Sequence, residues 1–193
     1  MKLITISGLD GSGKSTQLSA LREKYEMNGK KTYYFHAIHF SLAQKLKKKS
    51  TSNLASERGV TSASALSIML REILLPIDIV RFLVLKKKLS IQGYDIVLSD
   101  RYFYDTLVNI SYLKQSTKLK KMLIPRPNHA FLMSISPQEI MQRSRQPDQG
   151  IDYLKSKFAL YKKLAKRYEL IRVIRANKPA DIITSEVWKY CEH

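Results

Sequence analysis

Cysteine is almost absent from the 193-residue sequence, since Cys191 is its only cysteine, and no disulfide can form within the chain. One thiol and four scattered histidines give no zinc-binding spacing, and a reducing cytoplasm fits this composition. The sequence also lacks any run of about 18 apolar residues, so we expect no membrane-spanning helix. Residues 1–2 lead directly into a β-rich run, and we therefore expect no signal peptide and a cytoplasmic location.

Glycine is scarce too, with seven residues, yet three of them fall in one short segment that ends in Lys-Ser-Thr. The segment reads Gly8-Leu9-Asp10-Gly11-Ser12-Gly13-Lys14-Ser15-Thr16. It follows a β-rich run at residues 2–7 and precedes an amphipathic helical pattern at 17–25. This is the pattern of a phosphate-binding loop, in which backbone N–H groups and a helix N-terminus point at one anion. The alternative, a glycine-rich turn that binds nothing, rarely has this context, and we infer that the chain binds a nucleotide.

Acidic residues are few, 16 against 34 lysines and arginines, and the formal net charge is +18. Such a charge is compatible with nucleotides, nucleic acid or an anionic membrane surface as partners. The densest basic runs, at 45–49, 86–88 and 118–121, are interpreted as solvated surface. No aromatic residues alternate with these runs in the manner of single-strand-binding proteins, so nucleic acid is a possible but not a favoured partner.

Strand-like and helix-like segments alternate from one end of the sequence to the other. The five strand candidates are residues 2–7, 31–37, 94–99, 129–135 and 169–174. The pattern predicts one α/β domain over residues 1–193, with the three-layer P-loop NTPase fold and a five-stranded parallel sheet flanked by helices. Ligands of such sheets bind beyond the carboxyl ends of the strands.

Two of the intervening segments have less regular patterns. Residues 41–61 are polar, and we expect either a mobile connection or a short helix there. Residues 62–92 form a long helical pattern that Pro76 is predicted to divide or kink. The remaining helices are predicted at residues 102–113, 137–143, 151–168 and 179–190.

Four side chains near the predicted sheet edge suit phosphate chemistry. Lys14 is expected to reach the β- and γ-phosphates, and the Ser15 hydroxyl to ligate Mg²⁺. Asp100 ends an apolar strand, where its carboxylate could hold the metal directly or through water, and it could equally serve as a helix N-cap. The neighbouring Arg101 could bind a phosphate with both arms of its guanidinium.

A second arginine pair, Arg143 and Arg145, lies ahead of a loop rich in helix-breaking residues that ends at Gly150. We interpret residues 143–150 as a short arginine-bearing lid that closes over the transferring phosphate. The alternative is that both arginines only complement the dipole of the preceding helix.

The phosphate loop, followed much later by Ser99-Asp100-Arg101-Tyr102, resembles the thymidylate kinases, a group of P-loop nucleoside monophosphate kinases. A looser likeness continues through residues 127–143 and 173–176. The resemblance implies transfer of the ATP γ-phosphate to dTMP with Mg²⁺, giving dTDP and ADP, and a homodimer.

On this reading the functional residues fall into four groups. The ATP-binding residues are Gly8, Asp10, Gly11, Ser12, Gly13, Lys14, Ser15 and Thr16. The catalytic residues are Lys14, Arg101, Arg143 and Arg145. The acceptor-binding residues are Asp10, Arg81, Arg101 and Thr106. The metal ligands are Ser15 and Asp100.

The acceptor side departs from the family pattern. The Thr-Arg-Glu-Pro segment expected after the second strand is replaced by residues 35–39, which contain no arginine, glutamate or proline. Ile77 stands where the family has a phenylalanine that stacks on thymine, and Asn109 where an aromatic residue borders the sugar. Two alternatives therefore stay open: a kinase of the same fold for another nucleotide or a deoxynucleoside, or a catalytically weak nucleotide-binding protein with a basic interaction surface.

Overall fold

Strands and helices alternate along the chain in a computed structural model that describes residues 1–51, 65–119, 122–143 and 147–192. The strands are β1 (Lys2–Gly8), β2 (Thr32–His36), β3 (Ile96–Asp100), β4 (His129–Ser134) and β5 (Ile171–Arg175). The helices are α1 (Lys14–Met27), α2 (Ala37–Phe40), α3 (Leu42–Thr51), α4 (Ala65–Ile91), α5 (Phe103–Leu113), α6 (Pro137–Met141), α7 (Gly150–Arg167) and α8 (Ala180–Cys191). All five predicted strands are present.

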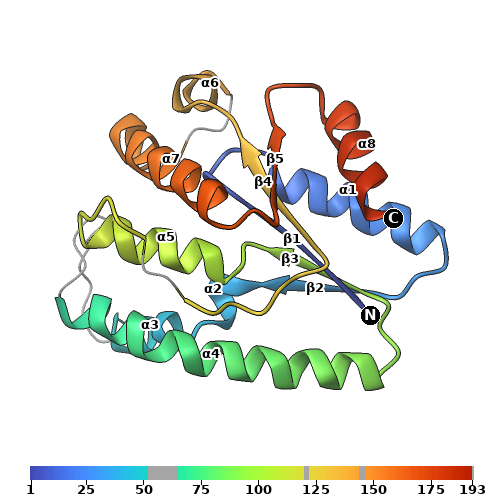
Figure 1. Cartoon of the computed structure of the whole chain (residues 1–193), viewed down its shortest axis with the longest axis horizontal. Helices are drawn as coiled ribbons and strands as arrows, with labels where there is room; N and C mark the ends of the chain where they lie inside the picture. Colours follow the sequence, from blue (N-terminus) through green and yellow to red (C-terminus); the bar gives the residue numbers. More distant parts are fainter. Residues whose placement is uncertain (52–64, 120–121, 144–146, 193) are drawn as a thin grey trace.

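The strands form one parallel sheet in the order β2-β3-β1-β4-β5. β1 and β3 lie near its centre and are buried almost throughout, and both carry apolar residues on each face. Helices α1 and α8 pack together on one side of the sheet, and α4, α5 and α7 lie on the other (Figure 1). The predicted α/β class, with a parallel sheet between two helical layers, is confirmed.

Two local predictions are refined by the structure. The sequence suggested a division or a kink at Pro76, and the structure contradicts the division, because the long helix α4 runs through this residue as a single element. Buried side chains on both sides of the proline, Leu75 and Ile79, anchor the helix against the core, and this packing outweighs the lost backbone hydrogen bond. α3 confirms a short helix in the first part of the polar stretch, and residues 52–61 lie outside the described part of the chain.

Within the described ranges, neither α4 nor any shorter helix combines the length and apolar character needed to cross a membrane.

Parallel pairing brings the carboxyl ends of the strands to one edge of the sheet. Asp100 pairs with Ile6 of β1 on one side and with His36 of β2 on the other, and Gly8 pairs with Met133 of β4. The loops that leave these strands therefore start beside one another, although they are far apart in the sequence. They enclose the candidate site.

Candidate active site

The glycine-rich segment forms the tight loop between β1 and α1. Gly8 has a φ of 144° and Gly11 a φ of 78°, values that L side chains rarely adopt. A Cβ atom at Gly8 would lie 2.8 Å from the Met133 carbonyl oxygen, and one at Gly11 would lie 2.9 Å from Cγ2 of Ile140. The loop is thus closed on its outer side by β4 and α6, while its inner side and the start of α1 line a cavity of about 1100 Å³.

Lys14 is buried at the start of α1, and its Nζ donates a hydrogen bond of 2.7 Å to the Leu9 carbonyl. Burial lowers the pKa of Lys14 to about 8, with a further contribution from Arg101, while nearby carboxylates including Asp10 oppose the shift. The ammonium therefore remains mostly protonated at neutral pH, with one hydrogen bond to the loop. A phosphate oxygen in the cavity would offer it a stronger partner than a neutral carbonyl.

Asp100 lies at the end of β3, where its Oδ2 accepts hydrogen bonds from Tyr34 Oη at 2.9 Å and Ser15 Oγ at 3.3 Å. Its Oδ1 is buried and has no hydrogen-bond partner within the described residues. The alternative role as helix N-cap is wrong, because Tyr102 is the N-cap of α5. The carboxylate is turned toward Ser15 instead of the first backbone N–H groups of that helix.

The oxygen atoms of Ser15 and Asp100 suit a magnesium ion. Mg²⁺ takes oxygen ligands, binds few protein groups and shares its remaining positions with water and phosphate. In the described ranges no cluster of three or more His, Cys, Asp or Glu residues could hold a metal by itself. A hydroxyl beside a carboxylate with one unpaired buried oxygen fits an ion that also needs ligands from a nucleotide.

Arg101 is buried beside the phosphate loop and is one of two described non-glycine residues with a positive φ, 64°. Its Nη1 donates to the Gly8 carbonyl at 3.2 Å, and its Nη2 donates to the carboxylate of Asp10. Although burial opposes charge, Tyr161 and the carboxylates Asp105 and Asp10 keep the pKa of Arg101 above its usual value. The strained backbone conformation turns a permanent cation toward the loop that receives phosphate.

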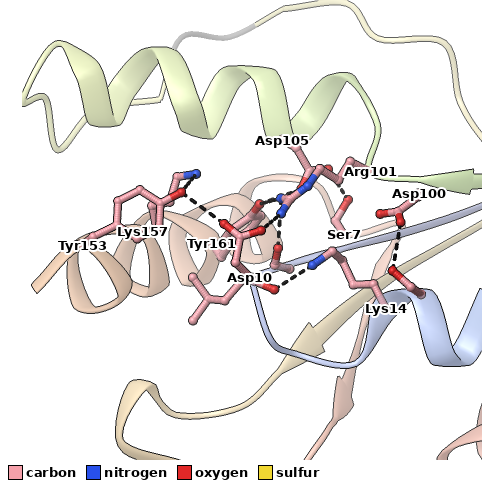
Figure 2. A network of polar contacts seen from close by, with 12 residues as sticks. Ser7, Asp10, Lys14, Asp100, Arg101, Asp105, Tyr153, Lys157 and Tyr161 are labelled. Atoms are coloured by element: carbon pink, nitrogen blue, oxygen red, sulfur yellow. Dashed lines mark hydrogen bonds and ion pairs between the residues drawn. The ribbon is translucent and has the colours of Figure 1, made fainter. Parts of the chain in front are cut away.

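Asp105 is a central member of this network that the sequence analysis missed. With 1% of its surface exposed, it accepts hydrogen bonds from Ser7 Oγ and Tyr161 Oη, both at 2.6 Å, and from the Tyr102 backbone N–H at 2.8 Å. It also pairs with Nη1 of Arg101 at 3.3 Å, as Figure 2 shows. Asp105 therefore fixes Arg101 and joins β1, α5 and α7 in one polar cluster.

Two further residues on α7, Tyr153 and Lys157, approach the site from the side of Asp10 (Figure 2). Tyr153 Oη donates to Asp10 Oδ2 at 3.2 Å, and Lys157 Nζ donates to Tyr153 Oη at 2.7 Å. Burial raises the pKa of Asp10, but Arg101, then Lys14 and Lys157, bring it below its usual value. Asp10 is consequently an ionised carboxylate, held between Arg101 at the end of β3 and Tyr153 on α7.

The described part of the predicted lid already touches the loop. Arg143 Nη1 donates to the Gly11 carbonyl at 2.6 Å and Nη2 to the Ala176 carbonyl at 2.8 Å. Arg143 and residues 147–149 line the same cavity as Lys14, while Arg145 lies outside the described residues.

The structure brings most of the predicted site residues together around one cavity. Those that line the cavity are Asp10, Gly11, Ser12, Gly13, Lys14, Ser15, Thr16, Asp100, Arg101 and Arg143. Gly8 lies behind the loop and contributes its carbonyl to Arg101.

Thr106 and Arg81 are not among the described residues that line this cavity. Arg81 pairs with Asp78 at 2.6 Å and donates to the Phe40 carbonyl at 3.2 Å. Acceptor binding by these two residues stays a prediction.

The arrangement agrees with comparisons to known proteins. The family model for thymidylate kinase matches residues 6–187 of this sequence. The chain belongs to the thymidylate kinase family. The predicted family is thereby confirmed.

Several individual thymidylate kinases are similar over nearly their whole length. A protein of Sulfolobus acidocaldarius named "Probable thymidylate kinase" is 28% identical over 97% of this chain and 95% of its own. One of Archaeoglobus fulgidus with the same name is 26% identical over 98% of this chain and 94% of its own. Among solved structures, the thymidylate kinase of Candida albicans superimposes with a TM-score of 0.69 at 20% identity, covering 99% of this chain and 91% of that one. The P-loop kinase fold expected from the sequence is thus also that of a solved thymidylate kinase.

Proposed function

We propose that this chain transfers the γ-phosphate of ATP to dTMP, giving dTDP and ADP, as the thymidylate kinase family does. One observation supports the proposal most strongly: the glycine loop, the buried Lys14, the unpaired oxygen of Asp100 and Arg101 all line a single cavity. A triphosphate and a second phosphate can approach each other there between fixed cations.

On the donor side, the triphosphate of ATP would lie along the loop, against the backbone N–H groups that open α1. Lys14 would exchange the Leu9 carbonyl for the β- and γ-phosphate oxygens. Ser15 and Asp100 would hold Mg²⁺, which when bound neutralises part of the phosphate charge. Lys14 and Asp100 are buried, which keeps water away from them and strengthens the attraction of Lys14 for the charge that spreads over the γ-phosphoryl oxygens.

On the acceptor side, Arg101 would hold the phosphate of dTMP and Asp10 would contact its sugar. An oxygen of the dTMP phosphate forms the new bond to the γ-phosphorus while the bond from that phosphorus to the ADP oxygen breaks. Arg143, next to Gly11, would neutralise the transferring group from the lid side, and Arg145 would join it on closure. Phosphoryl transfer needs such positioning more than any covalent participation of the protein.

Acceptor choice is tested by measuring ADP production with ATP, Mg²⁺ and a panel of nucleosides and monophosphates. We expect the highest kcat/KM with dTMP, and a value for dUMP lower by about tenfold or more because dUMP lacks one methyl group. The Candida albicans relative is described as having broad substrate specificity, so every common base belongs in the panel.

Other outcomes of the panel select among the alternatives. A higher kcat/KM with another monophosphate or with a deoxynucleoside would replace dTMP as the acceptor. Salt-dependent retention of DNA or RNA without ADP production from any acceptor would instead favour a nucleotide-binding protein that acts through its basic surface.

We also propose a homodimer, formed through the outer face of α4. Large apolar side chains recur there about once per helical turn and are exposed: Met69, Ile73, Ile77, Val80 and Val84. A strip along one helix can pack against its own copy around a two-fold axis, and it is unusual on a chain this rich in lysine. The position of Ile77 in this strip agrees with a role other than stacking on a base.

Replacing Val80, the fourth residue of this strip, tests the dimer. We expect Val80→Glu to convert a particle of twice the 22.3 kDa chain mass into a monomer at micromolar concentration, as measured by light scattering. Ile182→Glu on α8, an equally conspicuous exposed apolar residue on the other side of the sheet, is the matched control and should leave the mass unchanged. Equal masses for the wild type and Val80→Glu would refute this interface.

The single thiol, Cys191, bears on the proposed reaction and on a cytoplasmic location, which we also propose. Cys191 is buried, and burial raises the pKa of its thiol to about 12. A thiol that stays protonated is a poor nucleophile, so it takes no part in the proposed reaction. The chain has no second cysteine with which an oxidising compartment could form an internal disulfide.

A further inference from the structure

Three buried cations and three carboxylates form the polar network beside the proposed site. The cations are Lys14, Arg101 and Lys157, and the carboxylates are Asp10, Asp100 and Asp105. Five of these six groups already have a part in the mechanism or in fixing Arg101. Lys157 has none, and it is not among the described residues that line the nucleotide cavity.

Lys157 lies in the middle of the inner face of α7, with 5% of its surface exposed. Its Nζ donates to Tyr153 Oη and lies 4.7 Å from the centre of the Tyr153 ring and 6.0 Å from that of Tyr112. A buried ammonium is costly, and an apolar side chain of similar length would serve packing alone at least as well. The position of this charge therefore calls for a functional explanation.

The hydrogen-bond chain from Lys157 ends at Asp10. Tyr153 accepts from Lys157 and donates to Oδ2 of Asp10, while Arg101 donates to the other oxygen, Oδ1 (Figure 2). Asp10 is thus held by two cations from opposite sides, directly by Arg101 and through the Tyr153 hydroxyl by Lys157. The side chain of Asp10 is partly exposed, and it borders the cavity.

Acceptor binding changes this balance. Nη1 of Arg101 is engaged by the Gly8 carbonyl, Asp105 and Tyr161, whereas the described partner of Nη2 is Asp10 alone. Nη2 is consequently the nitrogen that can turn to a phosphate. As it does so, Asp10 loses its direct cation while a second anion enters the site.

We propose that Lys157, acting through Tyr153, is a positioning residue that becomes the counter-ion of Asp10 when Arg101 turns to the acceptor phosphate. This inference rests on the proposed function of the same site. Burial lowers the pKa of Lys157 to about 8, with a contribution from Arg101 that Asp10 and Asp105 oppose. Lys157 is therefore still charged in most molecules at neutral pH. Without that charge, Asp10 retains Arg101 more strongly and acceptor binding weakens.

The test compares Lys157→Met with Lys155→Met, a matched substitution on the exposed side of the same helix. For Lys157→Met we expect the KM of dTMP, and its dissociation constant from calorimetry, to rise about tenfold, with kcat and the KM of ATP within about twofold. Tm should fall by no more than about 3 °C, because the variant removes a costly buried charge. Lys155→Met should match the wild type in every measurement.

A double-mutant cycle distinguishes the hydrogen-bond chain from a packing effect. In a Tyr153→Phe background the chain to Asp10 is already cut, so adding Lys157→Met should change the KM of dTMP by less than about twofold. Full additivity of the two substitutions would overturn the inference, as would a Tm loss accompanied by equal decreases in kcat for all acceptors.

The inference and the proposed function fail in different ways. An active wild type whose dTMP KM and dissociation constant are unchanged by Lys157→Met would overturn the inference alone. A folded wild type that neither binds dTMP nor phosphorylates it would overturn the proposed function, and this inference with it.

Discussion

The Lys14→Ala variant is expected to lose phosphoryl transfer by about a hundred- to a thousandfold while remaining folded, as measured by ADP formation and by Tm. The Lys14 ammonium supplies positive charge to the phosphates during transfer, and nothing in the described loop can replace it. In the absence of nucleotide it makes one hydrogen bond, to Leu9, and its burial is costly. Its removal should therefore leave Tm within about 3 °C of the wild-type value.

Lys30→Ala is the matched control, since Lys30 is exposed just beyond the end of α1. It should retain full activity. Turnover by Lys14→Ala close to that of the control would remove charge stabilisation by this lysine from the mechanism. A large decrease in Tm for Lys14→Ala would instead indicate that this lysine stabilises the fold.

Asp105→Ala is expected to be the most destabilising of the substitutions considered. It removes a carboxylate that accepts hydrogen bonds from three elements and leaves Arg101 buried with less compensation. Breaking a buried charge pair in this way costs about 3–5 kcal/mol. In a chain of this size, that cost corresponds to a Tm decrease of about 10 °C.

The control for this prediction is Asp152→Ala, which removes a carboxylate on the surface of α7 whose ion pair with Lys155 is loose, at 3.9 Å. Its effect on stability should stay within about 0.5 kcal/mol. If thermal unfolding gave the same Tm for the two variants, the buried network would not carry the stability assigned to it.

Much of the fold was predictable because its signals are local. Strand-like runs alternate with helical patterns, and this alternation is sufficient to indicate a parallel sheet with its ligand at the carboxyl edge. The phosphate loop was recognisable for the same reason, since its glycines and Lys14 are adjacent in sequence. α4 was less predictable at Pro76, because burial of Leu75 and Ile79 depends on the rest of the core.

The network around Arg101 was not predictable, because its partners are distant in sequence. Ser7 and Asp105 are 98 residues apart, and Tyr161 is 56 residues beyond Asp105. Thr106, the predicted acceptor contact, is adjacent to Asp105 in sequence. Neighbouring residues on a helix point about 100° apart, so the position of Thr106 gives no signal for the buried contacts of Asp105, and the acceptor role of Thr106 stays a prediction.

Two signals could have been read from the sequence. Arg81 lies three residues after Asp78, a spacing at which a helical ion pair forms, and the structure contains that pair. On α7, Lys157 falls within a helical stripe of otherwise largely apolar buried residues that includes Leu154 and Leu164. A lysine on the buried face of an amphipathic helix indicates a charge with a specific partner.

The most direct test of the proposed function is a count of products from the purified chain. With ATP, Mg²⁺ and dTMP, the two nucleoside diphosphates should accumulate together, one dTDP for each ADP, and both should disappear in Lys14→Ala. Well-folded protein that yields no dTDP, or that releases ADP at a rate independent of dTMP, would contradict transfer between the two nucleotides.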